Sequence, residues 1–278
     1  MPSRLARRQT LASFDYQWRH LPAGEAMLSD PWFVEHAPAI VADELLAVDR
    51  AWFRGRAVLD AGCGGGRWTV ALLRLGCAVR AVDASPSALA ATRAQAARLV
   101  PEAIAEGRLQ TEQVDLLLLP PSLSARRFDL VFSFGVLHHT GDTRRALGAL
   151  AELVAADGLL FVYLYGRASA RGPRAALLRG ARLALAPLPF AAKRAVLRWL
   201  LPGRDPHQAF DLLSPLVNDV SDPDVVAGWL RESGFTDVAR TAEHSEIFLR
   251  AAREACSARP FRPAASRPYW FERYRPRP

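Results

Sequence analysis

Residues 56–83, RAVLDAGCGGGRWTVALLRLGCAVRAVD, decide the expected fold of this chain. A short apolar strand at 57–59 leads into Asp60 and then into a turn with glycines at positions 62, 64, 65 and 66. A helical stretch follows, and a second strand ends at Asp83. Glycines let a backbone turn sharply and approach a ligand closely, and the first turn of the next helix presents unpaired N–H groups. The segment therefore predicts a nucleotide-binding turn.

The spacing within this turn indicates which nucleotide it suits. The dinucleotide fingerprint G-x-G-x-x-G requires a third glycine at position 67, where this chain has Arg67, so a nicotinamide dinucleotide is disfavoured. An acidic residue ahead of the glycines, here Asp60, suits a ligand with a cationic amino group, whereas a pyrophosphate suits a bare helix N-terminus. Asp83 follows the glycines by about 20 residues, the spacing expected of an acceptor for a ribose diol.

The pattern D-x-G-x-G-x-G, formed by Asp60, Gly62, Gly64 and Gly66, resembles motif I of the class I S-adenosylmethionine-dependent methyltransferases. Later segments follow in the order typical of this family. They are a strand at 109–114 that ends at Asp115, FDLVFSFGVLHH at 128–139, LGALAELVAADGLLFVYLY at 147–165, and an expected hairpin within 234–251. The resemblance implies a Rossmann-like α/β fold with a mostly parallel seven-stranded sheet and helices on both faces.

The resemblance also implies S-adenosyl-L-methionine as the cofactor and assigns residues to it. Asp83 would hold the ribose, and Asp115 would accept from the adenine amino group. Because ligands of parallel sheets sit at the carboxyl ends of the strands, these groups should converge with residues 133–139 in one crevice. The expected cofactor-binding residues are Asp60, Gly62, Cys63, Gly64, Gly66, Arg67, Asp83, Ala84, Asp115, Leu116 and Ser133.

His138 and His139 directly follow the expected fourth strand and are the candidate catalytic residues. Methyl transfer from a sulfonium is an in-line displacement that depends on orientation in a dry pocket and requires no metal. A neutral histidine has a pKa suited to deprotonating a phenol or an alcohol. Adjacent residues cannot both face one atom, and His138 is the favoured member of the pair. The alternative is that a histidine here only bonds the neighbouring backbone and shapes the loop.

The chain is expected to divide into a core and three appendages. The methyltransferase core occupies 56–165 and 221–252, with a helical N-terminal cap at 1–55, a basic helical insertion at 166–220 and an Arg/Pro-rich tail at 253–278. Ser85 before Pro86, Asp142 or Thr143, and Asp222 before Pro223 are expected to cap helices. The tail is expected to be disordered, although Tyr269, Trp270 and Phe271 offer enough aromatic surface to dock.

The insertion carries the main alternatives for the substrate site. Positions 167–204 hold nine basic residues and no acidic one, and Pro187 and Pro189 split them into two expected helices. A lid over the substrate crevice is favoured, and basic amphipathic helices lying on an anionic membrane are the alternative. The expected substrate contacts are Trp18, Asp211, Ser214 and Asn218. For the contacts in the insertion, the alternative is that residues 214–219 only form turns. For Trp18, the favoured alternative is that it anchors a leading helix on the sheet together with Phe14 and Tyr16.

Composition and charge argue against a nucleic-acid-binding protein and a membrane-spanning protein. The 278 residues carry a formal charge of +8, but Lys193 is the only lysine. Such an arginine bias reflects genome composition better than a nucleic-acid surface, because the core has no alternating basic and aromatic signature. Cys63, Cys77 and Cys256 form neither a zinc pair nor a disulfide framework, which fits a cytoplasmic protein, and no apolar stretch has the length of a membrane span.

These observations favour S-adenosylmethionine-dependent methyl transfer to a small molecule, with oxygen as the preferred acceptor atom. An RNA or protein acceptor is the first alternative. Methylation of a nitrogen on a nucleic-acid base is disfavoured, because SFGV stands after the fourth strand in place of an Asn/Asp-Pro-Pro-Tyr/Phe tetrapeptide. Two further alternatives stay open: methylation of a lipid or quinone acceptor at a membrane surface, and a scaffold that binds the cofactor without catalysis. The oligomeric state is left open as well.

Overall fold

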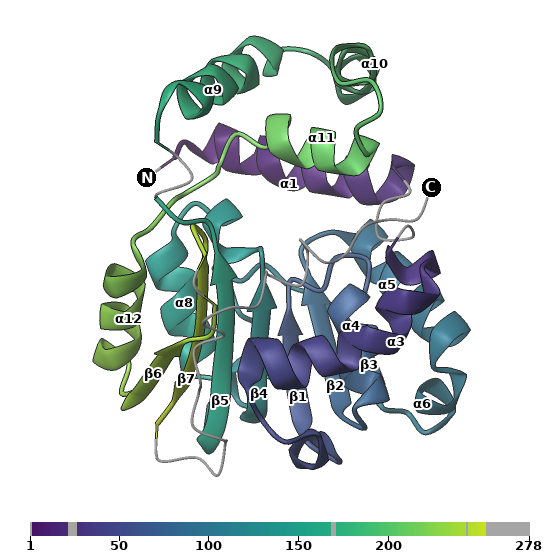
Figure 1. The fold of residues 1–278 in the computed structure, drawn as a ribbon, viewed down its shortest axis with the longest axis vertical. Coiled ribbons are helices and arrows are strands. Elements are labelled where there is room, and N and C mark those ends of the chain that lie inside the picture. The colour runs from purple at the N-terminus through teal and green to yellow at the C-terminus, as the bar shows by residue number, and fades with distance from the viewer. Residues whose placement is uncertain (1, 22–26, 168–170, 243, 254–278) are drawn as a thin grey trace.

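The computed structural model describes residues 2–21, 27–167, 171–242 and 244–253, and its centre is one sheet (Figure 1). Seven strands lie in the order β3-β2-β1-β4-β5-β7-β6. Their bounds are β1 Ala57–Ala61, β2 Ala78–Asp83, β3 Leu109–Gln113, β4 Phe128–Phe134, β5 Val154–Leu164, β6 Asp237–Arg240 and β7 Ile247–Ala252. Strands β1 to β5 are parallel, and β7 pairs antiparallel with both β5 and β6. The expected Rossmann-like fold is confirmed.

Alternating side chains of the central strands build a separate hydrophobic core on each face of the sheet. Val58, Leu130 and Phe161 pack on one face with α4 (Arg67–Arg74) and α5 (Pro86–Leu99). Their neighbours Leu59, Val131 and Leu160 pack on the other face with α8 (Thr143–Ala151) and α12 (Pro223–Glu232). Successive residues of a strand point to opposite faces, so a strand covered on both sides is apolar throughout. The short helices α6 (Pro101–Ala105) and α7 (Pro121–Ser124) complete the core.

The N-terminal region consists of two parts with different places in the fold. Helix α1 (Arg4–His20) crosses above the carboxyl ends of the strands, whereas α3 (Pro31–Ala39) lies against the sheet (Figure 1). After α3, a π-helical turn at Ile40–Leu46 and a 3₁₀ turn at Arg50–Phe53 bury Ile40, Leu46 and Phe53 in the core with α4. The first part therefore has the position expected of a cap over the crevice, whereas most of the second part belongs to the core.

The insertion forms three helices that lie over α1. They are α9 (Pro173–Leu185), α10 (Phe190–Leu200) and α11 (Pro206–Leu213), and Pro187 and Pro189 lie between the first two. A third apolar cluster, which includes Leu185, Leu197 and Phe210, joins these helices to Tyr16 of α1. Helix α1 is thus held between the insertion and the sheet (Figure 1). Within the described ranges, no helix combines the length and the apolar character needed to cross a bilayer.

The predicted helix caps differ in outcome. Ser85 accepts the N–H of Ala88 (3.1 Å) and Asp142 accepts that of Arg145 (3.1 Å), as expected. Asp222 occupies the N-cap position of α12, but its carboxylate pairs with Arg167 (3.0 Å) instead of the first N–H groups of the helix. The expectations for the tail, including its three aromatic residues and Cys256, lie outside the described residues.

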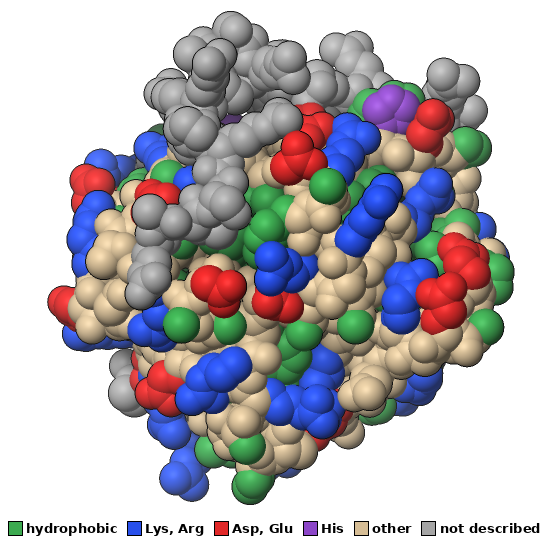
Figure 2. All heavy atoms as spheres, turned by 90° about the horizontal axis from the view of Figure 1, so that it is seen from below, with side chains coloured by type: hydrophobic (Ala, Val, Ile, Leu, Met, Phe, Trp, Pro, Cys, Tyr) green, Lys and Arg blue, Asp and Glu red, His purple; other side chains and the backbone are tan. Residues whose placement is uncertain are grey.

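The face at the amino ends of the strands carries both signs of charge. Figure 2 shows arginine side chains interspersed with acidic ones across this face. The pairs include Arg56 with Asp129 (3.1 Å) and Arg108 with Glu106 (2.5 Å). Interspersed charges do not build the one-signed surface that binds a phosphate backbone. On this face, arginines therefore lie beside acidic residues and do not form a continuous positive patch.

Candidate functional site

A cavity of about 970 Å³ lies at the carboxyl ends of the strands, between the sheet and the helices α1 and α11. This volume is at the upper end of the range usual for small-molecule sites, so a nucleoside cofactor and a second molecule can fit together. The expected site residues that line it are Gly62, Cys63, Gly64, Arg67, Asp83, Ala84, Asp115, Leu116, Trp18, His139 and Asp211. The expected residues missing from its described lining are Asp60, Gly66, Ser133, His138, Ser214 and Asn218.

The glycine turn between β1 and α4 has no space for side chains. Gly62 has a φ of +85°, and a Cβ there would lie 2.3 Å from the Cγ2 atom of Val136. At Gly64, with a φ of +54°, a Cβ would lie 2.6 Å from the Trp18 ring. The N–H groups of Gly62 and Cys63 both donate to the carbonyl of Val82 (2.7 and 3.0 Å), which ties the turn to the end of β2. The backbone itself therefore forms this wall of the cavity.

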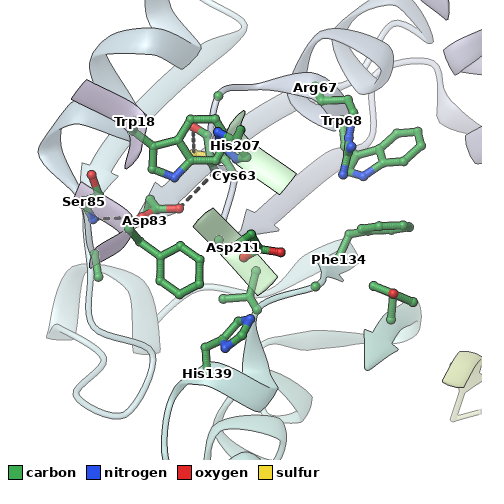
Figure 3. Close-up of a pocket in the computed structure, with 18 of the residues that line it drawn as sticks. Trp18, Cys63, Arg67, Trp68, Asp83, Ser85, Phe134, His139, His207 and Asp211 are labelled. Atoms are coloured by element: carbon green, nitrogen blue, oxygen red, sulfur yellow. Dashed lines mark hydrogen bonds between the residues drawn. The ribbon is translucent and has the colours of Figure 1, made fainter. Parts of the chain in front are cut away.

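Asp83 ends β2 and lies beside the glycine turn (Figure 3). Its two carboxylate oxygens accept the N–H groups of Gly64 (3.0 Å) and Ser85 (2.8 Å). Burial raises the pKa of this carboxyl, and the backbone N–H donors act in the opposite direction. Each oxygen keeps a second lone pair, so the carboxylate can still accept from a pair of hydroxyl groups in the cavity.

Asp60 lies beneath the turn and outside the cavity lining, so its expected role toward a cationic amino group of the cofactor stays a prediction. The side chain is buried and accepts the Thr69 hydroxyl at 2.5 Å, so it links β1 to α4. Burial raises its pKa to about 7. Ser133 is also absent from the described lining, and its hydroxyl is buried and donates to the carbonyl of Ala61 (3.0 Å). Gly66 packs on Thr92 of α5 instead of facing the ligand space.

Asp115 lines the cavity, but its carboxylate also binds helix α1. Both of its oxygens accept from the Arg7 guanidinium, and Oδ1 accepts the N–H of Leu117 (3.0 Å). The Nε atom of Arg7 donates to the carbonyl of Thr140 (2.9 Å). An ion pair therefore lines the cavity here, and contact between Asp115 and an adenine stays a prediction.

The three aromatic residues of α1 face different neighbours. Phe14 and Trp18 are four residues apart, share one side of the helix and line the cavity. The Trp18 ring lies over the glycine turn, near His207 of α11 (ring centroids 4.7 Å apart; Figure 3). Tyr16 points away from the cavity and stacks on Phe210 of the insertion (5.5 Å). The idea that all three anchor the helix on the sheet is therefore wrong.

The structure reverses the expected order of the two histidines. His139 lines the cavity, and its Nδ1 atom lies 2.8 Å from the carbonyl oxygen of Val217. A carbonyl only accepts, so Nδ1 carries the proton and the Nε2 lone pair remains. Burial lowers the pKa of His139, which keeps the ring neutral at pH 7. His138 is buried against Tyr165 (centroids 3.8 Å apart), and in the described chain neither of its ring nitrogens has a hydrogen-bond partner.

Asp211 is the expected substrate contact from α11 that reaches the cavity. Its Oδ2 atom accepts from the Tyr165 hydroxyl (3.4 Å), and burial raises the pKa of its carboxyl. Ser214 and Asn218, the other substrate contacts expected in the insertion, are absent from the described cavity lining. Ser214 accepts the Ser13 hydroxyl (2.7 Å), and Asn218, with its amide oxygen turned toward Arg182, accepts from both terminal nitrogens of that guanidinium (2.7 and 2.9 Å).

An aromatic wall faces the histidine side of the cavity, and the sequence analysis did not identify it. Trp68, Phe134, Tyr163 and Tyr165 line this region, with Phe134 stacked on Tyr163 at 4.5 Å. The Arg67 guanidinium lies over the rings of Trp68 (5.0 Å) and Phe134 (5.4 Å). The signal was present in the aromatic ends of the expected strands, FSF at 132–134 and YLY at 163–165. This wall suits a planar, apolar group.

Together, the parallel sheet, the side-chain-free turn after β1 and the carboxylate at the end of β2 define a nucleoside-binding α/β protein with room for a second ligand. Comparison with known proteins narrows this class. A family model described as a methyltransferase domain matches residues 59–160. This range of the chain is therefore similar to a methyltransferase domain, and the fold is that of the Rossmann-like class I methyltransferases.

Two curated relatives are ubiquinone biosynthesis O-methyltransferases. The chain is 35% identical to the mitochondrial one of Schizosaccharomyces pombe over 121 residues, which cover 43% of this chain and 41% of that protein. It is 32% identical to that of Caulobacter vibrioides over 161 residues, 58% of this chain and 56% of that one. The chain thus spans about half the length of these relatives.

Solved structures show the same fold at lower identity. An O-methyltransferase family protein from Burkholderia thailandensis matches with a TM-score of 0.54 and 18% identity, covering 86% of this chain and 62% of that one. Magnesium protoporphyrin IX methyltransferase from Synechocystis PCC 6803, with bound S-adenosylmethionine, matches with a TM-score of 0.51 and 17% identity, covering 90% of this chain and 96% of that one.

Proposed function

We propose that this protein transfers a methyl group from S-adenosyl-L-methionine to an oxygen of a small-molecule acceptor. The observation that carries the proposal is one cavity that is lined by Asp83, the glycine turn, His139 and an aromatic wall. The cofactor residues fit: the turn admits a ligand where a Cβ would collide, and Asp83 keeps lone pairs for a ribose diol. A scaffold without catalysis would need no base in this cavity.

In this proposal, the side chains of the protein orient the two ligands, provide a base and exclude water. When bound, the cofactor supplies an electrophilic methyl carbon. The Nε2 atom of His139 can take the proton of an acceptor hydroxyl at neutral pH, because the ring is neutral and its proton is on Nδ1, against the Val217 carbonyl. The Asp211 carboxylate and the Val217 carbonyl then stabilise the imidazolium that results. Phe14 packs edge-on against His139 (4.8 Å) and excludes water from it.

The acceptor that the cavity favours is a phenol on a planar ring. The rings of Trp68, Phe134 and Tyr163 offer flat contact surfaces beside His139. The names of the curated relatives place O-methylation in ubiquinone biosynthesis, which supports a quinol-like phenol for this chain as well. A cytoplasmic location is part of the proposal, supported by the buried free thiols of Cys63 and Cys77.

Calorimetric titration with S-adenosylhomocysteine tests the cofactor assignment. We expect saturable binding with one site per chain, because the product fills the same half of the cavity as the cofactor. A folded sample that gives no heat at millimolar ligand would end the proposal. Incubation with S-adenosylmethionine and a panel of catechols and other phenols, followed by mass spectrometry, then tests the acceptor class through the gain of one methyl group.

A second candidate, methylation of a quinone-like or lipid acceptor at a membrane surface, is favoured by the outer side of the insertion. Leu177, Leu183, Trp199 and Leu200 of α9 and α10 are between 50% and 79% exposed. The same helices carry Arg179, Arg194 and Arg198. Exposed apolar residues beside arginines are typical of helices that lie on anionic lipid.

Vesicle flotation measures this surface contact. We expect the protein to float with vesicles that contain phosphatidylserine and not with neutral ones, and we expect the double variant Leu177→Ser, Trp199→Ser to lose at least half of the bound fraction. Leu118→Ser is the matched control, since Leu118 is equally exposed (68%) but lies outside the insertion. Equal partition of the double variant and the wild type would remove the membrane from the proposal.

A further inference from the structure

Thr10 makes an unusual set of hydrogen bonds for a threonine in the middle of a helix. Its side chain is buried, and its hydroxyl donates to the carbonyl of Ala6 (2.9 Å) in the same helix. The same oxygen accepts two backbone N–H groups from a distant segment, those of Leu216 (3.1 Å) and Val217 (2.9 Å). The first bond is the usual one for a buried threonine within a helix. The other two fix the segment that follows α11.

Neighbouring residues of α1 hold the same segment. The Gln9 side chain donates to the carbonyl of Ser214 (2.9 Å) and accepts the N–H of Leu216 (3.2 Å), and the Ser13 hydroxyl donates to that of Ser214 (2.7 Å). From the other side, Arg182 of α9 donates to the carbonyl of Leu212 (2.8 Å). Segment 214–217 is therefore bound by α1, and Arg182 of α9 binds the residues Leu212 and Asn218 that flank it.

Segment 214–217 contacts His139, the proposed base, through Val217. Val217, whose N–H is bound by Thr10, is the residue whose carbonyl oxygen lies 2.8 Å from Nδ1 of His139. The Thr10 bonds hold the peptide group before the Cα of Val217, and the peptide group that carries the Val217 carbonyl is the next one along the chain. Fixing the first group therefore restricts where the carbonyl of the second can lie. The neutral imidazole has two tautomers, and the partner of one ring nitrogen decides which nitrogen keeps the lone pair. Only the form with the proton on Nδ1 presents a lone pair at Nε2.

We propose that Thr10 is a positioning residue that holds His139 in its base-competent tautomer through Val217. This inference rests on the proposed function, in which His139 is the base. Helix α1 also bonds the cofactor end of the cavity, where Asp15 accepts the Ser85 hydroxyl (2.8 Å) and Arg7 pairs with Asp115. The helix that covers the cofactor end therefore also prepares the base at the acceptor end.

Other charged and titratable groups around His139 set its pKa but do not select its tautomer. His138 and Tyr165 contact the ring, with centroids 4.2 and 5.8 Å away. The charges of Asp211 and Asp219 raise the pKa of His139, and that of Arg182 lowers it. None of the hydrogen bonds described for these side chains goes to a ring nitrogen of His139. The Val217 carbonyl is the group that distinguishes Nδ1 from Nε2.

Long-range ¹H–¹⁵N NMR of histidine-labelled protein tests the inference without a known acceptor. In ligand-free wild type we expect the Nδ1–H tautomer of His139, assigned by the loss of its signals in His139→Gln. Thr10→Val keeps the shape but removes the hydroxyl, and should reduce the ratio of the two tautomers by about tenfold, the equivalent of one hydrogen bond. Thr10→Ser keeps the hydroxyl and should restore the wild-type ratio.

Control variants separate positioning from stability. Thr241→Val removes a hydroxyl from another buried threonine and should leave the tautomer unchanged. If Thr10→Val does not fold, Gln9→Ala removes two bonds from the same segment at a half-buried site and should shift the ratio in the same direction. Unchanged His139 signals in a folded Thr10→Val or in Gln9→Ala would overturn the inference. Titration with S-adenosylhomocysteine reports separately on the cofactor site, so failure of the proposed function is recognised independently.

Discussion

Asp83→Ala is expected to weaken binding of S-adenosylhomocysteine by about 10²–10³-fold, as measured by isothermal titration. A carboxylate that accepts two ribose hydroxyls makes two charge-assisted hydrogen bonds of about 1.5–3 kcal/mol each. The substitution also removes the acceptor for the N–H groups of Gly64 and Ser85, which loosens the glycine turn. Both effects act on the cofactor half of the cavity, so the loss should appear as affinity and not as stoichiometry.

The charge of Asp83 gives this prediction a pH dependence. Burial raises the pKa of its carboxyl, so in the free protein it takes up a proton at a higher pH than an ordinary aspartate. Binding that requires the carboxylate is strong above that pKa and weakens as the pH falls through it. Asp83→Asn keeps the shape and should bind weakly at every pH. Asp157→Ala, at an exposed carboxylate of β5, is the matched control. Wild-type affinity in Asp83→Ala would place the cofactor elsewhere.

The sequence predicted the sheet well because its strands carry their own pattern. The segments around Val58, Leu130 and Leu160 are apolar runs covered on both faces, and each lies between turn or helix signals that can be read locally. The glycine turn and the position of Asp83 were equally accessible. A turn without side chains and an acidic strand end are properties of neighbouring residues, so distant contacts were not needed to find them.

The sequence does not show in the same way whether a polar side chain faces the cavity or the protein interior. Asp60 and Asp83 both stand at or near strand ends, but Asp60 bonds Thr69 inside the protein while Asp83 faces the cavity. His138 and His139 belong to one 3₁₀ turn, Leu137–His139, in which successive residues point about 120° apart. The direction of that turn depends on Val217, 78 residues away from His139 along the chain. Local patterns contain no record of such a contact.

The roof of the cavity was the least predictable part for a related reason. Helix α1 meets segment 214–217 through bonds that span more than 200 residues, such as those of Thr10 and Ser13. Its aromatic residues alternate between two surfaces, with Trp18 over the glycine turn and Tyr16 against Phe210. Neither surface exists until the insertion folds back over the sheet. A helix wedged between two layers needs apolar residues on both sides, which weakens the one-sided pattern that a surface helix would show.

His139→Gln is expected to lower kcat for a phenolic acceptor by about 10²–10⁴-fold, the contribution typical of a general base. Affinity for S-adenosylhomocysteine should stay within about threefold of wild type, because the hydrogen bond described for His139 goes to Val217 and not to Asp83 or the glycine turn (Figure 3). The wild-type profile of kcat against pH should fall on its acidic side only below the ordinary histidine pKa of 6.5, since burial lowers the pKa of His139. The variant should lose this acidic limb of the profile, so its kcat should no longer fall as the pH is lowered.

His138→Gln separates the two histidines in the same assay. Its ring is buried against Tyr165 and lies outside the cavity lining, so this substitution should lower the melting temperature and leave the acidic limb in place. His20→Gln, at an exposed position of α1, should change neither quantity. If His138→Gln removed the limb while His139→Gln kept it, the base would be His138. The hydrogen bond from Nδ1 of His139 to Val217 would then serve only to hold the loop.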